Sequence, residues 1–144
     1  MANTKYATEE EFIEAFGVEL TIELTNLEDP EAETVDSTVM DRGLTRATSL
    51  INGYLSGRYA LPLATVPELL KSLCLDIARY NLGIYAKEDD VRMRYDDAVR
   101  QLQQIANGTL NLGLAAVDTP AVASGSPQFT APARVFDTQS LEGF

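Results

Sequence analysis

The chain has 144 residues, 45% of them hydrophobic and 23% charged, as is ordinary for a single globular domain. Its formal net charge of −11 disfavours sequence-general DNA binding, because an acidic surface repels phosphate at long range. The single cysteine, Cys74, excludes a disulfide within the chain, and no apolar stretch approaches the ~20 residues of a membrane-spanning helix. We therefore expect a protein made and kept in a reducing, cytoplasm-like setting, with no membrane partner.

Much of the negative charge lies in the first third of the sequence. Acidic residues recur from Glu9 to Asp41, and Lys5 is the only base before Arg42. A solvated face that keeps the protein soluble explains this charge. A surface that avoids nucleic acid, or that docks on a basic partner, explains it too.

The N-terminal part predicts short helices and a loop. Thr8 and Glu11 have the spacing of a capping box, so a helix is expected to open there, with an apolar stripe from Phe12 to Phe16, and to end at Gly17. Residues 18–25 alternate like a strand but are short and flanked by acids, which favours a second short helix. Residues 26–36 are polar and acidic and contain a proline, as is typical of a loop.

Apolar residues at steps of three and four predict three longer helices, over about residues 37–56, 67–86 and 89–107. Gly43 weakens the first of these helices, which suggests close packing at that point. Pro67 suits a first helical position, and Gly108 is expected to end the third helix. The fold class is therefore mostly α, a compact bundle of about four helices.

The C-terminal part has a different composition. We expect residues 1–113 to form the helical domain and residues 114–144 to form an extended arm rich in Pro, Ala and Ser. Large apolar groups return near the end of this arm: Phe129, Val135, Phe136, Leu141 and Phe144. Either the arm packs on its own bundle or it binds a neighbouring molecule, and simple disorder is the third alternative.

No set of residues forms a recognisable catalytic or metal-binding constellation. Histidine is absent, as are the glycine-rich phosphate loops, and Cys74 lies in an apolar run that is typical of a buried thiol. The carboxylates of residues 88–90 and 96–97 are better explained by helix capping and solvation than by a bound cation. We expect no enzyme activity, no catalytic residue, no cofactor and no metal.

Arg58 and Tyr59 follow Gly57 at a predicted helix end, beside the Leu61-Pro62 turn. In one interpretation Tyr59 and Leu61 fold back onto the core while Arg58 meets helix carbonyls or an acid. In the other, Arg58 and Tyr59 are an exposed contact to another subunit. The candidate subunit or partner contacts are therefore Arg58, Tyr59, Phe129, Arg134, Val135, Phe136, Leu141 and Phe144.

Several segments, in this order and spacing, resemble the Mu-like phage family of small neck proteins, which was long filed as a domain of unknown function. The resemblance covers residues 6–113 well and the arm loosely. It rests on an N-terminal tyrosine with an acidic helix, on a glycine–arginine–tyrosine turn followed by Leu-Pro, and on motifs in the later helices. The matching residues include Tyr6, Glu10, Glu11, Phe12, Gly17, Ile51-Asn52-Gly53-Tyr54-Leu55, Arg58-Tyr59-Ala60-Leu61-Pro62-Leu63, Asp76-Ile77-Ala78-Arg79-Tyr80, Tyr95-Asp96-Asp97-Ala98 and Arg134-Val135-Phe136.

The resemblance implies a head–tail connector, an adaptor or head-completion protein in the neck of the virion. Such proteins form a homo-oligomeric ring, commonly a dodecamer, that joins the portal protein to a tail terminator or another neck protein. DNA would pass through the channel without sequence-specific binding. The chain would be made in the host cytoplasm and located in the virion neck.

Two alternatives from other classes stay open. A small acidic cytoplasmic binding or inhibitory module would use its charged face to block a basic enzyme. A carboxylate-based metal-dependent hydrolase would depend on Asp89 and Asp90. The connector hypothesis adds that deleting residues 115–144 should reduce assembly while the bundle stays folded.

Overall fold

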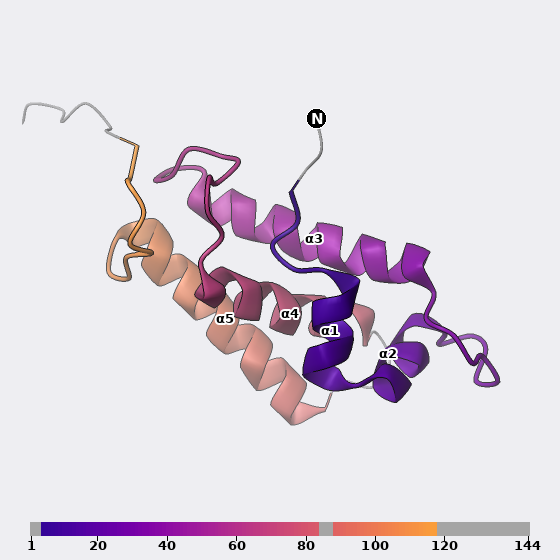
Figure 1. Ribbon diagram of the computed structural model, residues 1–144. Helices are drawn as coiled ribbons and strands as arrows, with labels where there is room; N and C mark the ends of the chain where they lie inside the picture. The colour runs from indigo at the N-terminus through magenta and orange to yellow at the C-terminus, as the bar shows by residue number, and fades with distance from the viewer. Residues whose placement is uncertain (1–3, 84–87, 118–144) are drawn as a thin grey trace, which may run out of the picture.

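The computed structural model describes residues 4–83 and 88–117, and within them the chain forms five helices (Figure 1). The two short helices are α1 (Glu9–Phe16) and α2 (Val18–Thr25). The three long ones are α3 (Ser37–Leu55), α4 (Glu68–Leu82) and α5 (Asp89–Asn107). The predicted mostly α fold is confirmed.

The three long helices pack against one another, α1 lies across them, and α2 lies toward one end of the group. In Figure 1, α3 runs along the top, α4 lies beneath it and α5 crosses below. Helix α1 contacts α2 and α3, while α2 contacts α3 and α4. The turn after α3 lies at the left end of the molecule, and α2 with the following loop lies at the right.

The predicted apolar stripes form a single core. All three long helices contribute fully buried side chains, and α1 adds Phe12. Tyr54, Tyr80 and Tyr95, which belong to the predicted stripes, are half-buried, and Tyr80 stacks on Tyr95 with ring centroids 3.9 Å apart. The core includes Met40, Leu44, Ala47, Ile51, Leu55, Leu70, Leu73, Cys74, Ile77, Ala98, Leu102 and Ile105.

The capping box at α1 is confirmed. The Thr8 hydroxyl accepts a hydrogen bond from the Glu11 backbone N–H at 3.2 Å, and the Thr8 N–H donates to the Glu11 carboxylate at 2.9 Å. Gly17 has a φ of +90°, a conformation that side chains disfavour, and it separates α1 from α2. The second short helix over residues 18–25 is therefore confirmed as well.

Helix α4 differs slightly from its prediction. Pro67 is not the first helical residue: its ψ of 146° is extended, and the helix begins at Glu68. The helix ends at Leu82 because Gly83, a poor helix former, leaves the helical conformation. Ile84, the last member of the predicted stripe, lies outside the described residues.

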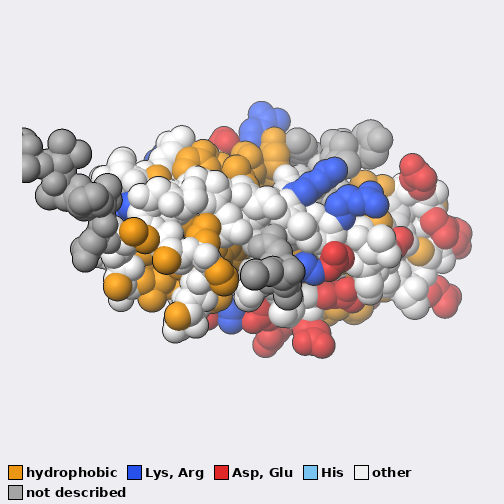
Figure 2. Space-filling model, turned by 90° about the horizontal axis from the view of Figure 1, so that it is seen from above, with side chains coloured by type: hydrophobic (Ala, Val, Ile, Leu, Met, Phe, Trp, Pro, Cys, Tyr) orange, Lys and Arg blue, Asp and Glu red, His pale blue; other side chains and the backbone are white. Residues whose placement is uncertain are grey.

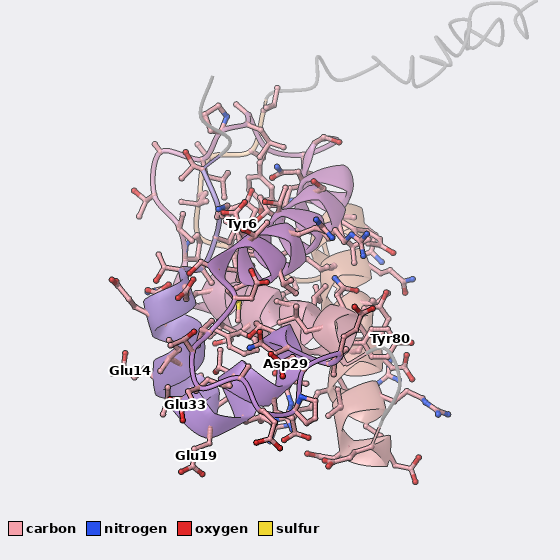
Figure 3. All side chains as sticks on the ribbon, turned by 90° about the vertical axis from the view of Figure 1, so that its right-hand side faces the viewer. Tyr6, Glu14, Glu19, Asp29, Glu33 and Tyr80 are labelled. Atoms are coloured by element: carbon pink, nitrogen blue, oxygen red, sulfur yellow. The ribbon has the colours of Figure 1, made fainter. Side chains whose placement is uncertain are left out.

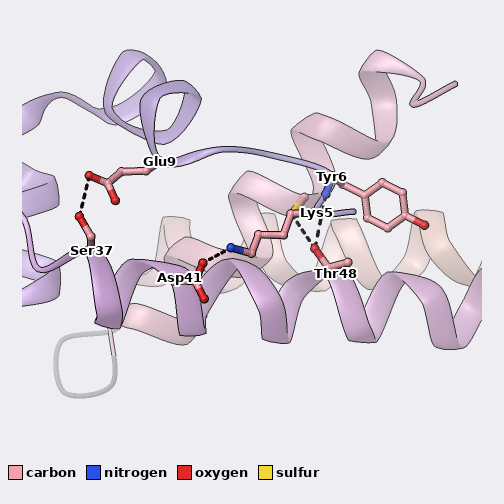
Figure 4. Close-up of polar contacts among 7 residues, drawn as sticks. Lys5, Tyr6, Glu9, Ser37, Asp41 and Thr48 are labelled. Atoms are coloured by element: carbon pink, nitrogen blue, oxygen red, sulfur yellow. Dashed lines mark hydrogen bonds and ion pairs between the residues drawn. The ribbon is translucent and has the colours of Figure 1, made fainter. Parts of the chain in front are cut away.

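Two local features hold other parts of the chain close to α3: Gly43 and the segment before α1. A Cβ atom at Gly43 would lie 2.9 Å from Leu82 Cδ2, so the predicted close packing is confirmed. Residues before α1 lie along α3 (Figure 4), where Lys5 forms an ion pair with Asp41, and the Tyr6 N–H donates to the Thr48 hydroxyl at 3.4 Å. This segment therefore ties the start of the chain to the middle of α3.

Candidate interaction surfaces

The Arg58-Tyr59 turn is built into the core rather than displayed on the surface. Tyr59 is 2% exposed, and its backbone N–H donates to the Leu55 carbonyl at 2.9 Å, which continues the end of α3. Leu61 packs against the core, and the Leu61–Pro62 peptide bond is cis. Of the two interpretations of Tyr59, the structure agrees with the folded-back one. Its side chain therefore offers no accessible contact within this bundle.

Arg58 is half-buried against the end of α5. Gly108 ends that helix with a φ of +87°, as predicted, and a Cβ atom there would lie 1.9 Å from Arg58 Nη1. The guanidinium therefore occupies the space that only a glycine leaves open. Arg58 Nε is buried without a hydrogen-bond partner, so packing and the negative end of the α5 dipole hold this side chain.

Residues 108–117 return along the same turn. The Leu112 N–H donates to the Tyr59 hydroxyl at 3.4 Å, and the Val117 N–H donates to the Arg58 carbonyl at 2.8 Å. Leu110, Leu112 and Leu114 pack against the core from this segment. The first residues of the predicted arm thus contact the bundle, and the chain leaves it beside the end of α3.

The remaining candidate contacts all belong to the C-terminal arm. Phe129, Arg134, Val135, Phe136, Leu141 and Phe144 lie outside the described residues.

The opposite end of the molecule is strongly acidic. Residues 9–36 hold eleven of the 22 acidic residues and no Lys or Arg. The rest of the chain holds eleven acids and eleven bases, so this one stretch accounts for the whole net charge of −11. Figure 3 looks onto this end, where Glu14, Glu19 and Glu33 point outward from α1, α2 and the loop after α2.

Hydrogen bonds at its base hold the acidic loop in place. The Asn26 side-chain amide donates to the Thr34 carbonyl at 2.9 Å, and the Asp36 N–H donates to the Thr25 hydroxyl at 3.1 Å. Asp36 in turn caps α3 by accepting from the backbone N–H groups of Thr38 and Val39. A hollow of about 540 Å³ lies between this loop and α3, with Arg42 and Arg46 among its lining residues.

One carboxylate of the acidic stretch, that of Glu11, forms an ion pair with a lysine. Lys71 of α4 lies 2.8 Å from Glu11, and this hydrogen-bonded pair lowers the pKa of the Glu11 carboxyl. The same contact raises the pKa of Lys71. Glu11 therefore joins α1 to α4, whereas the outward-pointing acids remain free to act on a distant charge.

Two of the three arginines of α5, Arg94 and Arg100, form ion pairs. Arg94 lies 3.5 Å from Asp90 and 3.9 Å from Asp76, and Arg100 lies 2.9 Å from Asp97. Burial raises the pKa of Asp76, and the nearby Arg94 partly opposes that effect. These pairs describe a mixed surface with no continuous basic stripe along α5.

Cys74 is a buried thiol, as predicted. It is fully enclosed by the core, and burial raises its pKa to about 11. Across residues 4–83 and 88–117, no group of three or more Cys, Asp or Glu side chains is placed to hold a metal ion. Within the same ranges no helix has the length and apolarity to cross a membrane.

Sequence reasoning missed the contact between residues 108–117 and the Arg58 turn. A signal for it was present, because Leu110, Leu112 and Leu114 alternate with polar or small residues directly after α5. The placement of the acidic loop and the Arg58 turn at opposite ends of α3 follows from the predicted helix between them, which has 19 residues and is about 28 Å long.

These observations describe a small, mostly α-helical protein with two chemically different ends, and with no assembled catalytic site in its described part. Residues 6–131 match the family described as "Bacteriophage Mu, Gp36", so the chain belongs to this family of phage proteins. The resemblance to a Mu-like phage family is therefore confirmed.

Two relatives support the same assignment. The chain is 32% identical to "Mu-like prophage FluMu protein gp36" of Haemophilus influenzae over 139 residues, which cover 96% of this chain and 97% of that protein. It is 35% identical to "Gene product J" of Escherichia phage Mu over 79 residues, which cover 55% of this chain and 56% of that protein.

Proposed function

We propose that this chain is a head–tail connector, a structural protein whose copies form a ring between the portal and the tail in the phage neck. Its membership of a phage protein family supports a role in the particle. The expected partners are further copies of the chain, the portal protein, and a tail terminator or another neck protein. The chain would act in the virion neck after synthesis in the host cytoplasm.

The observation that carries this proposal is the concentration of the whole net charge in residues 9–36, at one end of the bundle. In a ring, such ends can line a channel with negative charge. DNA inside that channel is repelled from the wall, so it slides without sequence-specific binding. A ring lined by Lys and Arg would instead hold the phosphates.

The C-terminal arm supports the ring in a second way. Ring contacts are heterologous, so one surface of a copy must fit a different surface of the next. The arm begins at the Arg58 turn and then continues for 27 residues beyond Val117. A segment of that length supplies one half of a heterologous contact by binding to a neighbouring copy.

We also infer that the chain catalyses no reaction. The thiol of Cys74 is buried and has a pKa of about 11, so it is not a ready nucleophile. The hydrolase alternative needs the carboxylates of Asp89 and Asp90. Both lie in the first turn of α5, where their negative charge stabilises the helix by interacting with the positive end of its dipole. A thermal shift with Mg²⁺ or Mn²⁺ that disappears in Asp89→Asn/Asp90→Asn would contradict this inference.

The experiment that tests the connector is electron microscopy of the full chain, alone and mixed with the portal protein, together with mass spectrometry of purified virions. We expect rings with a central channel, and the chain in stoichiometric amounts in the particle. A monomer that never joins the portal or the virion would overturn the proposal.

The role of the acidic end is tested separately. Replacing Glu19, Glu23, Glu28 and Glu31 with Gln should leave the ring intact but slow the passage of DNA, which is measured as genome release. A matched set of four exposed acids on α5, Asp89→Asn, Asp90→Asn, Asp96→Asn and Asp97→Asn, should have a smaller effect. Equal effects of the two sets would argue against an acidic channel.

The same acidic end favours one alternative, a small binding or inhibitory module. Residues 9–36 hold eleven acids and no base, and the acids of this stretch that point outward suit a strongly basic partner. This alternative predicts a stable monomer or dimer and a specific basic protein whose binding weakens as salt rises. Pull-down from phage-infected cells at low and high salt distinguishes it from the ring.

A further inference from the structure

The end opposite the acidic stretch carries almost no charge. It is formed by residues 56–67, which follow α3, and by residues 108–117, which follow α5. Between them these segments contain a single charged side chain, the half-buried Arg58. We call these two segments the uncharged end.

The uncharged end also presents apolar surface. Val117 is 49% exposed in one of its segments, and Ala60, Pro62 and Ala64 are exposed in the other. Figure 2 shows hydrophobic side chains and no acidic ones on the left part of the face in view, whereas acidic side chains lie along its lower centre and at the right. Covering such a surface removes apolar area from water without desolvating an ion, so contact there is favourable.

Charge decides which surface can meet another copy. Two identical chains each carry −11, and their acidic ends repel each other. The lowest repulsion is reached when a copy approaches the surface with the least charge, about one length of α3 away from the acidic loop. The uncharged end is therefore suited to contact between like copies rather than to a basic partner.

The arm supplies a segment that fits this end. Its start is fixed there by the hydrogen bond from the Val117 N–H to the Arg58 carbonyl, at 2.8 Å. Apart from Val122, residues 118–128 are small, polar or proline, whereas residues 129–144 contain Phe129, Val135, Phe136, Leu141 and Phe144. The eleven-residue spacer can extend about 36 Å. The arm would need a much shorter spacer to reach the uncharged end of its own copy, where it begins.

We propose that the uncharged end of one copy receives residues 129–144 of a neighbouring copy. This inference rests on the proposed ring and names the surface that closes it. Each copy would be bound at its uncharged end and would reach the next copy with its own arm. That arrangement is heterologous, and it gives a ring when the rotation from copy to copy completes a full turn.

Disulfide trapping in the full chain tests the pairing. One chain carries Ala64→Cys at the uncharged end and a second carries Ser140→Cys in the arm. Cys74 is retained because it is buried. After mixing and mild oxidation, mass spectrometry should find the 64–140 bridge, which in this mixture forms only between two copies. A control chain with Thr34→Cys on the acidic loop should give about tenfold less bridging to position 140.

Two outcomes would overturn the inference. One is equal bridging of position 140 to positions 34 and 64. The other is a bridge that forms inside the doubly substituted chain Ala64→Cys/Ser140→Cys but not in the mixture, which would mean that the arm covers its own copy. If rings form on the portal without any 64–140 bridge, only this pairing is rejected. If no rings form and the chain is absent from purified virions, the proposed function is rejected as well.

A pair of charge variants gives a second readout. Ala60→Asp/Ala64→Asp places two carboxylates on exposed positions of the uncharged end and should abolish assembly, as measured by analytical ultracentrifugation. Thr34→Asp/Thr38→Asp adds the same charge to exposed positions near the acidic loop and should leave assembly largely intact. Unchanged circular dichroism of both variants shows that folding is not the cause, and equal assembly of both would contradict the proposal.

Discussion

Gly108 is the residue at which α5 ends and the chain turns back toward Arg58. Its φ of +87° disfavours any side chain, and a Cβ atom would meet Arg58 Nη1. We expect Gly108→Ala to lower the free energy of unfolding by about 1–2 kcal/mol, mainly through backbone strain, because the arginine end can move aside. Urea denaturation measures the change. Gly53→Ala is the control, since Gly53 has open space and a helical position where Ala is favoured.

The Glu11–Lys71 pair gives the fold a defined response to acid. The pKa of Glu11 is lowered in the folded protein by Lys71, so its carboxylate stabilises the fold above its ordinary value of 4.5. That contribution is lost as the pH falls below 4.5 through the lowered pKa. We expect the stability difference between the natural chain and Lys71→Met to shrink over this range in urea titrations.

Arg100→Met serves as the control for that measurement. Arg100 pairs with Asp97 on an open surface, where both side chains are more than half exposed and water screens the attraction. Its effect on stability should be smaller at every pH. An acid response of Lys71→Met identical to that of the natural chain would contradict the role given to the Glu11–Lys71 pair.

At the scale of helices, Gly43 sets how closely α3 approaches the end of α4. Leu82 lies where a side chain at position 43 would project, so we expect Gly43→Val to lower the free energy of unfolding by about 1–3 kcal/mol. Leu82→Ala removes the obstructing side chain, and the double variant should lose less stability than the two single variants combined. Strict additivity in urea denaturation would mean that the two positions are not coupled.

At the scale of the whole molecule, the net charge of −11 opposes the association of like copies. Added salt screens this repulsion, since the Debye length falls from about 10 Å at 0.1 M to about 3 Å at 1 M. Contact through an uncharged, apolar surface should therefore strengthen as NaCl rises over this range, as measured by sedimentation. Dissociation with rising salt would indicate that copies meet through opposite charges instead.

Much of the fold could be predicted because its signals are local. The Thr8–Glu11 capping box, the glycines at 17 and 108, and the apolar steps from Met40 to Ile51 each act within a few residues. The predicted end of α4, at about residue 86, was wrong, because the apolar pattern continues past Gly83 whereas the helix ends at Leu82. The interaction surfaces were predicted only as candidates, and Tyr59 shows why: its aromatic ring suits either a core or a contact.

The sequence by itself determined the helices, their caps, the buried thiol and the excess of acid in residues 9–36, because these depend on neighbouring residues and on composition. Only the tertiary structure decided that Arg58 lies over Gly108 and that residues 108–117 pack on its turn, which together form the uncharged end. These features join segments about 50 or more residues apart. No local pattern encodes such pairings, because they follow from how whole helices bury their apolar faces against one another.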